Sequence, residues 1–188
     1  LKKMADDIPK VTNNILPDQK LDCVAYGCTS GTIAAGYQSI FDKVNLAKPN
    51  TKVTTPITST INALKSLKIK RLSIFTPYTD EINQSIINYF KKENIDVNEL
   101  FYFDIASDLD IGKVDPQYLF EVLTKIDLKK SDALFVSCTA LPVLSIISEL
   151  EKKISKVVLS SNQTLIWDTL KEIKYNDNVE GFGELFNN

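Results

Sequence analysis

The chain has 188 residues, 44% of them hydrophobic and 24% charged, with a formal net charge of -2. This balance is typical of a globular protein that buries a sizeable core, and it favours neither nucleic acid nor a membrane surface as a partner. No apolar run approaches the ~20 residues of a membrane span, and the acidic opening residues are unlike a signal peptide, so we expect a cytoplasmic protein.

Five strand-like segments alternate with helical patterns along the chain. The expected strands cover residues 22–27, 70–76, 99–103, 133–137 and 156–160. An N-cap residue followed by proline marks helix starts at Thr55-Pro56 and Asp115-Pro116, Pro142 opens a further helix, and another is expected around residues 33–41. The polar residues 104–114 are predicted to form a loop, a candidate lid. The alternation indicates an α/β fold with parallel sheets.

One sequence pattern occurs twice, 110 positions apart. Residues 22–29 and 132–139 each begin with Asp, continue through a short apolar run and end in Cys-Thr, with the thiols at Cys28 and Cys138. Each copy has the pattern of a buried strand that ends in a thiol, and in parallel sheets ligands bind outside the carboxyl ends of the strands. The repeat therefore predicts two halves that share one site with two thiols.

The repeat also predicts a domain organisation. We assign residues 1–52 and 162–188 to a first α/β domain and residues 53–161 to a second. Before Asp132 the chain has room for strand, helix, strand, loop and helix, whereas only 21 residues precede Asp22. If the halves are equivalent, a strand-helix-strand piece of roughly 40 to 50 residues is expected to be missing from the first domain.

The residue types restrict the chemistry. The chain contains no histidine, which excludes Ser-His-Asp and Cys-His activation and most catalytic zinc sites. The three cysteines, an odd number, fit reduced thiols better than a disulfide framework, and their spacing is unlike that of metal ligands. We therefore predict no metal site, and acid–base chemistry carried by cysteine, tyrosine, lysine or carboxylate side chains.

The first thiol, Cys28, is followed by Thr29 and Ser30 at a predicted helix start. Backbone N–H groups and hydroxyls at a helix N-terminus favour a bound carboxylate, and the same positive end favours the thiolate of Cys28. The alternative is that Cys28 is a small buried thiol beside a capping hydroxyl. Cys23, at the start of the same strand, is predicted to belong to the core.

Polar side chains follow further strands as well. The second thiol, Cys138, and its neighbour Thr139 lack the Ser-Gly of the first copy, which favours proton transfer over anion binding. Tyr78 and Asn162 each follow a strand and either contact the substrate or have a structural role, Tyr78 in packing and Asn162 as a helix cap. Arg71, the only arginine, begins a strand and is expected at the opposite edge of the sheet, away from the substrate.

Four motifs together carry a family likeness. They are Tyr-Gly-Cys-Thr-Ser-Gly-Thr, Thr-Pro-Tyr-Thr-Asp-Glu, Ser-Cys-Thr-Ala-Leu and Ser-Ser-Asn-Gln-Thr-Leu-Ile-Trp-Asp. In this order and spacing they resemble the maleate cis-trans isomerase branch of the aspartate/glutamate racemase superfamily. The resemblance implies two pseudo-symmetric Rossmann-like α/β domains with a cofactor-free site in the cleft between them. It further implies that Cys28 is the nucleophile, that Cys138 is the acid/base, and that Tyr78 and Asn162 bind a substrate carboxylate.

The predicted function is cofactor-independent cis-trans isomerisation of maleate or a similar small dicarboxylate. Thr29, Ser30 and adjacent amides would stabilise the enolate, and Thr139 is a further candidate for substrate binding. The alternatives are an amino-acid or hydantoin racemase, a catabolic protein of the ectoine-utilisation type, and a non-catalytic dicarboxylate-binding protein. Related arylmalonate decarboxylases keep only one of the two thiols, so the pair argues against decarboxylation. Self-association into a homo-oligomer is left open.

Overall fold

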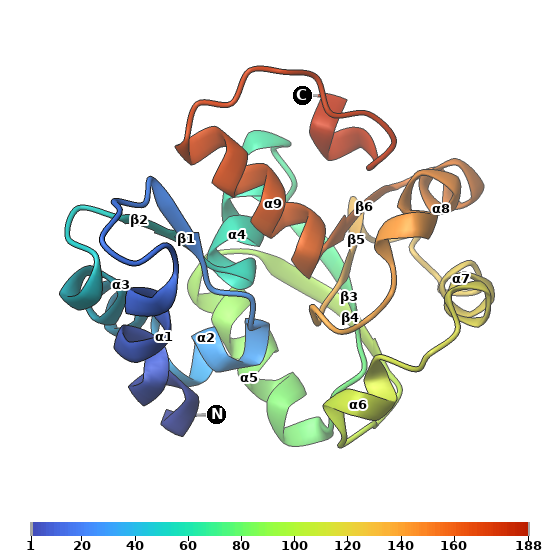
Figure 1. The fold of residues 1–188 in the computed structure, drawn as a ribbon. Coiled ribbons are helices and arrows are strands. Elements are labelled where there is room, and N and C mark those ends of the chain that lie inside the picture. Colours follow the sequence, from blue (N-terminus) through green and yellow to red (C-terminus); the bar gives the residue numbers. More distant parts are fainter. Residues whose placement is uncertain (1, 188) are drawn as a thin grey trace.

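The computed structural model describes residues 2–187 as an α/β protein with two parallel sheets (Figure 1). The smaller sheet pairs β1 (Cys23–Ala25) with β2 (Lys52–Thr54). The larger sheet has the order β4-β3-β5-β6, from β3 (Arg71–Thr76), β4 (Asp96–Tyr102), β5 (Ala133–Val136) and β6 (Val157–Ser160). Because the strand pairs of both sheets are parallel, the predicted fold class is confirmed.

Helices connect the strands and cover the sheets. They are the 3-10 helix η1 (Lys2–Asp7), α1 (Ile8–Asn14), α2 (Thr29–Ala35), α3 (Tyr37–Ala47), α4 (Pro56–Ser66), α5 (Asp80–Lys92), α6 (Asp108–Ile111), α7 (Pro116–Leu123), the 3-10 helix η2 (Leu144–Ile146), α8 (Ile147–Ile154), α9 (Ser161–Glu172) and the 3-10 helix η3 (Glu184–Asn187). Within residues 2–187, no helix is long and apolar enough to span a bilayer.

Each sheet has its own hydrophobic core. The larger core surrounds β3 and β5, where side chains such as Leu72, Ile74, Leu134 and Phe135 are fully buried. The smaller core joins η1, α1, α3 and β2 through Ala5, Ile8, Ile40, Val44 and Val53. Two separate cores are expected if the protein consists of two α/β halves, each with its own sheet. The division of the chain after residues 52 and 161 stays a prediction.

The helix α9 joins the two sheets. It packs against α4 and contacts β1 and β2 of the small sheet and β6 of the large one (Figure 1). The α4–α9 contact is polar: the Ser59 hydroxyl donates to Asp168 Oδ2 at 2.7 Å, and the Thr60 and Thr164 hydroxyls lie 2.9 Å apart. Because these side chains are buried, their hydrogen bonds hold α9 against α4.

The two edges of the large sheet differ in chemistry. At the amino edge, Arg71 Nη2 contacts Asp132 Oδ1 at 2.6 Å, and the hydrogen bond from Arg71 lowers the pKa of Asp132. Arg71 thus lies where the sequence predicts it, at the opposite end of β3 from Tyr78. The candidate active site lies at the carboxyl edge, where hydroxyl and thiol side chains follow the strands.

Several predicted boundaries need correction. The strand β2 was not expected, because three residues are too few to form a recognisable apolar run. The helix expected around residues 33–41 is broken at Gly36, whose φ of +81° ends α2 and begins α3. The predicted loop 104–114 contains α6, capped by the Ser107 hydroxyl. Pro142 precedes its helix by two residues, because the chain turns once more before Leu144.

Candidate active site

The two cysteine loops leave the carboxyl ends of β1 and β5. The strand β1 ends at Ala25, and Tyr26 continues toward β2 with one more hydrogen bond, its N–H donating to Thr54 O at 2.9 Å. Cys28 is therefore the third residue after the strand instead of the first, because β1 is shorter than predicted. Cys138 is the second residue after β5. Both thiols still lie at the strand ends, as the repeat predicts.

Cys28 is the N-cap residue of α2, in extended conformation at φ -138°. Its sulfur accepts a hydrogen bond from the Gly31 N–H at 3.2 Å and lies 3.9 Å from the Ser30 hydroxyl. The Thr32 hydroxyl donates to Cys28 O at 2.7 Å and fixes the backbone. The Gly31 N–H and the Ser30 hydroxyl therefore both lie at the sulfur, at the start of the helix.

Cys138 has a backbone conformation that is rare for a residue with a side chain. Its φ is +96°, and such conformations cost about 1–3 kcal/mol and persist only where surrounding contacts hold them. The Cys138 N–H donates to the Ser161 hydroxyl at 3.0 Å, and Asn162 Nδ2 donates to Thr139 O at 2.8 Å. The start of α9 thus holds the thiol in a strained position, as is common at functional sites.

Burial determines the protonation of the second thiol. Cys138 is 5% exposed, and this burial raises the pKa of its thiol, opposed by the Tyr78 hydroxyl and the N–H groups of Ala140 and Leu141. The pKa of a thiol is ordinarily about 8.5, so a raised value keeps Cys138 protonated at neutral pH. Cys138 is therefore suited to donate a proton, whereas the donors around Cys28 suit a nucleophile.

Hydrogen bonds join the two cysteine loops directly. The Thr139 hydroxyl donates to Gly27 O at 2.9 Å, and the Thr29 hydroxyl lies 2.8 Å from the Ser161 hydroxyl. Ser161 thus contacts the residue after Cys28 and the backbone of Cys138 at once. In Figure 1, α2, the loop after β5 and the start of α9 accordingly converge in the middle of the view. The sequence-predicted loops therefore lie side by side.

Tyr78 faces both thiols. It is 5% exposed, and burial raises its pKa well above the ordinary value, with Cys138 and Cys28 raising it further. The neutral phenol of Tyr78 is therefore a hydrogen-bond donor beside the Cys138 thiol, which has its pKa lowered by this hydroxyl. Asn83 Nδ2 donates to Tyr78 O at 3.1 Å and holds the turn before α5. Tyr78 packs into the core as one of its two predicted roles requires, and its contact with the substrate stays a prediction.

The remaining candidate residues have partners within the protein. Thr29, Thr139 and Asn162 connect the loops through the hydrogen bonds described above, and Ser30 lies beside Cys28. The N-cap of α9 is Ser160, whose hydroxyl accepts from the Gln163 N–H, so the alternative of Asn162 as a helix cap is wrong. Substrate contacts of these four residues stay a prediction. Cys23 is half-buried, because the two-stranded sheet covers it incompletely, and so it does not belong to the core as predicted.

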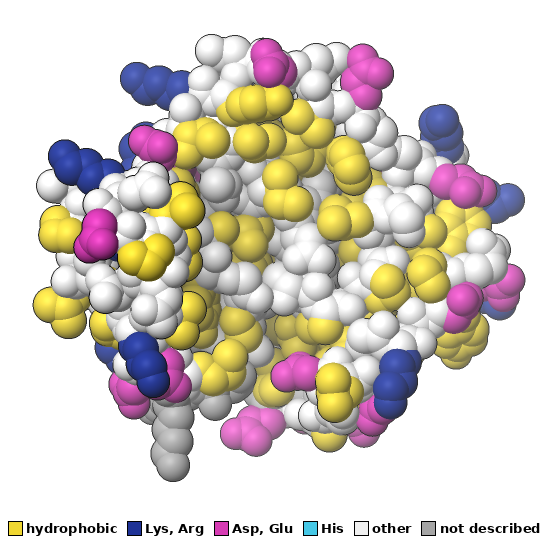
Figure 2. Space-filling model, viewed as in Figure 1, with side chains coloured by type: hydrophobic (Ala, Val, Ile, Leu, Met, Phe, Trp, Pro, Cys, Tyr) yellow, Lys and Arg dark blue, Asp and Glu magenta, His cyan; other side chains and the backbone are white. Residues whose placement is uncertain are grey.

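Uncharged groups dominate the centre of this face. Figure 2 shows charged side chains mostly around the rim, with hydrophobic side chains and uncharged polar atoms in the middle. Within residues 2–187, no group of three or more cysteine, aspartate or glutamate side chains is arranged to hold a metal ion. An anionic substrate here would be bound by hydroxyls, amides and backbone N–H groups.

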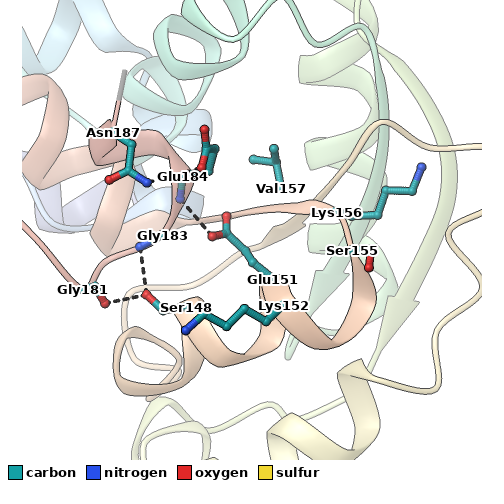
Figure 3. A pocket seen from close by; sticks show the side chains of 10 residues that line it. All are labelled: Ser148, Glu151, Lys152, Ser155, Lys156, Val157, Gly181, Gly183, Glu184 and Asn187. Carbon is teal, nitrogen blue, oxygen red and sulfur yellow. Dashed lines mark hydrogen bonds between the residues drawn. The ribbon is translucent and has the colours of Figure 1, made fainter.

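A pocket of about 570 Å³ lies elsewhere, between α8 and the segment after Gly181 (Figure 3). In it, Glu151 Oε1 accepts from the Val158 N–H and Oε2 from the Glu184 N–H, each at 2.9 Å. The Ser148 hydroxyl donates to Gly181 O at 2.7 Å. These contacts hold the last residues against α8 at the amino end of β6, so the pocket is separate from the thiols.

Comparison with known proteins identifies the family of this chain. The model of the arylmalonate decarboxylase family (Amdase) matches residues 40–186. The chain belongs to the arylmalonate decarboxylase family. The maleate isomerase of Geobacillus stearothermophilus, a similar curated protein, is 25% identical over 193 residues, which cover 98% of this chain and 76% of that protein.

Solved structures of maleate isomerases share the fold of this arylmalonate decarboxylase family member. A cysteine-to-alanine variant of the Pseudomonas putida S16 maleate isomerase, crystallised with maleate, matches with a TM-score of 0.89 at 21% identity, covering 98% of this chain and 77% of that one. A cysteine-to-serine variant of the Nocardia farcinica enzyme, with a covalently bound succinylcysteine intermediate, matches with a TM-score of 0.88 at 17% identity, covering 97% and 78%.

Ser161 is the site residue that sequence reasoning missed. We expect Ser161→Ala to lower the free energy of unfolding by about 1–3 kcal/mol, because it leaves the buried Cys138 N–H without its acceptor. Turnover should fall by about ten- to a hundredfold as the second thiol loses its fixed position. Urea unfolding and steady-state kinetics measure the two effects. Ser85→Ala, which removes an exposed hydroxyl on α5, is the control, and equal effects in both variants would contradict the role of Ser161.

Proposed function

We propose that the protein catalyses the cis-trans isomerisation of maleate, or a similar small dicarboxylate, without a cofactor. The observation that carries the proposal is the pairing of the two thiols. Their loops are joined by the Thr139–Gly27 hydrogen bond and by the contact of the Thr29 hydroxyl with Ser161, whose own hydroxyl accepts from the Cys138 N–H. One thiol is surrounded by donors and the other is kept protonated, which is the division of roles that addition and proton transfer require.

The reaction begins at Cys28. Its thiolate adds to one alkene carbon, a C–S bond forms, and the π electron pair moves to the neighbouring carbon and into the carboxylate attached to it. Cys138 then transfers its S–H proton to that carbon, which leaves a succinyl thioether on Cys28 and a thiolate at Cys138. The carbon–carbon bond is now single and can rotate, which the double bond of maleate prevents.

The second half of the reaction reverses these steps after rotation. The Cys138 thiolate removes the proton, the electron pair re-forms the double bond, and the C–S bond breaks to release the Cys28 thiolate and the trans product. The enediolate on each side of the intermediate needs hydrogen-bond donors. Tyr78, Thr29, Ser30 and the N–H groups at the start of α2 are proposed to supply them.

The comparisons support this assignment over the alternatives. Relatives with the same fold include maleate isomerases as well as arylmalonate decarboxylases, and one maleate isomerase, a cysteine-to-serine variant, holds a covalently bound succinylcysteine intermediate. A covalent adduct fits nucleophilic addition and does not fit a racemase in which both thiols act only as bases. Because both thiols must stay reduced for turnover, we propose a cytoplasmic location as part of the same function.

Proton NMR in deuterated water tests the proposal. The purified protein is incubated separately with maleate, phenylmalonate and aspartate. We expect the olefinic signal of maleate to be replaced by that of fumarate, with no loss of carbon dioxide from phenylmalonate and no exchange at the α-carbon of aspartate. Decarboxylation of phenylmalonate, or exchange into aspartate, without fumarate formation would overturn the proposal in favour of another member of the superfamily.

The pH dependence follows from the protonation of Cys138. The thiol must carry its proton to act as the acid, and it loses that proton as the pH rises through its pKa, which burial raises. We therefore expect kcat to fall only above the ordinary thiol value of about 8.5. Tyr78→Phe removes a group that lowers this pKa, so the basic limb should move to still higher pH. A fall of kcat that begins below pH 8 in the unmodified protein would contradict the assignment of Cys138 as the proton donor.

A further inference from the structure

Buried hydroxyls without partners lie beside the thiols. Among the residues that the structure describes, three buried side-chain oxygens make no hydrogen bond, those of Tyr26, Thr51 and Ser137. Tyr26 precedes Cys28 by two residues, and Ser137 directly precedes Cys138. A buried polar group without a partner costs about 1–3 kcal/mol, so each such group needs an explanation. Ser137 lies beside the Tyr78 hydroxyl and affects its pKa, whereas Tyr26 lies near Cys28, whose charge raises the pKa of Tyr26.

The Tyr26 hydroxyl and the Cys28 sulfur both lie close to the position that a Cβ of residue 31 would occupy. A Cβ placed on Gly31 would lie 2.7 Å from Cys28 Sγ and 2.9 Å from Tyr26 Oη. Both distances are shorter than real Cβ contacts, so only glycine leaves room for the two atoms. Burial raises the pKa of Tyr26, and the charge of Cys28 raises it further. The hydroxyl is therefore a neutral donor next to the sulfur.

We propose that Tyr26 is a positioning residue for Cys28, and that its hydroxyl donates a hydrogen bond to the sulfur when the thiol ionises. In the structure the Tyr26 hydroxyl makes no hydrogen bond to the sulfur, so the bond forms only when a small shift of either side chain beside Gly31 brings the two atoms together. The thiolate then has three donors, Tyr26, the Gly31 N–H and the Ser30 hydroxyl. Burying the Tyr26 hydroxyl without a partner costs free energy while Cys28 is a thiol. The hydrogen bond to the Cys28 thiolate offsets this cost, which explains why the hydroxyl is found in this position.

The effect is selective for the reactive form of Cys28. A thiolate accepts hydrogen bonds strongly, whereas the sulfur of a thioether accepts them weakly. Tyr26 therefore favours both the ionisation that starts the reaction and the departure of Cys28 that ends it. Among the described residues whose pKa is shifted, Tyr26 and Tyr78 are the groups that Cys28 affects. Both are neutral phenols, so neither opposes a negative charge on the sulfur.

The proposal rests on the proposed function only in taking Cys28 as the nucleophile, and its test uses no substrate. Cys28 is alkylated with iodoacetamide over a range of pH in a Cys23→Ser background, and the rate is followed on its own peptide by mass spectrometry. In Tyr26→Phe we expect the midpoint of the pH profile to rise by about one unit, which slows alkylation at pH 7 by about tenfold. The Cys138 peptide of the same sample should keep its profile.

Two controls separate this role from a structural one. Tyr37→Phe removes a tyrosine hydroxyl that donates to Val53 O at 3.1 Å and should leave the Cys28 profile unchanged. Incorporation of 3-fluorotyrosine at position 26 keeps the shape of the side chain and makes it a stronger donor, so the midpoint should fall. An unchanged Cys28 profile in both position-26 variants, or an equal shift at Cys138, would overturn the proposal. If the Cys28 profile shifts as expected but the unmodified protein does not turn over maleate, the result counts against the proposed function and not against the role of Tyr26.

Discussion

We expect Cys28→Ser to lower turnover of maleate by about a thousandfold or more while the protein stays folded. A serine hydroxyl ionises far above neutral pH, and the chain has no histidine to take its proton. The donors at the start of α2 would surround a group that never becomes a nucleophile. Fumarate formation measures the loss, and circular dichroism shows whether the fold is retained.

The control for this variant is Cys23→Ser. Cys23 is half-buried at the start of β1, with its sulfur 3.9 Å from the Thr54 hydroxyl, and burial raises the pKa of its thiol. We expect its replacement to leave kcat unchanged and to lower the free energy of unfolding by at most about 1 kcal/mol. Equal loss of turnover in the Cys23 and Cys28 variants would mean that the site is misassigned.

The second large effect is expected at Cys138. Cys138→Ser should also lower turnover by about a thousandfold, because a serine hydroxyl is too weak an acid to exchange protons with the intermediate. The backbone contacts of this residue with Ser161 involve only its N–H, so the serine variant keeps them. Steady-state kinetics with maleate checks the prediction.

A glycine at the same position separates chemistry from backbone strain. Because Cys138 has a φ of +96°, Cys138→Gly relieves a conformational cost while it removes the thiol. We expect a free energy of unfolding equal to or above that of the unmodified protein, together with the same loss of turnover. Activity retained in either Cys138 variant would leave a single-cysteine chemistry and contradict the two-thiol mechanism.

Much of the fold follows from local sequence signals. Apolar runs bounded by polar residues predict β3, β5 and β6 to within one or two residues, because both faces of these strands are buried. The strand β2 has no such run, since it needs only three residues to pair with β1. The break at Gly36 depends on how α2 and α3 pack, which a helical periodicity does not reveal.

The site was predictable to the extent that it depends on strand ends. Cys28, Cys138 and Tyr78 each follow a strand, so the sheet topology brings them to one edge. Ser161 and Tyr26 also directly follow strands, β6 and β1, but this signal does not show what their side chains contact. The contact of Ser161 with both loops depends on where α9 lies against the small sheet, and the direction of the Tyr26 side chain depends on the space beside Gly31.

The most direct test of the account is the covalent intermediate. Cys138→Ser protein is incubated with maleate, its intact mass is measured, and the modified peptide is mapped. We expect a mass increase of one maleic acid, located on Cys28 as a succinyl thioether. The Cys28 thiolate still adds to the alkene, solvent water slowly supplies the proton that Cys138 would have donated, and no thiolate remains to remove that proton and release the product. No adduct forms in the doubly substituted Cys28→Ser, Cys138→Ser protein. An unmodified Cys28 in the single variant, or an adduct on another residue, would contradict nucleophilic addition by this thiol.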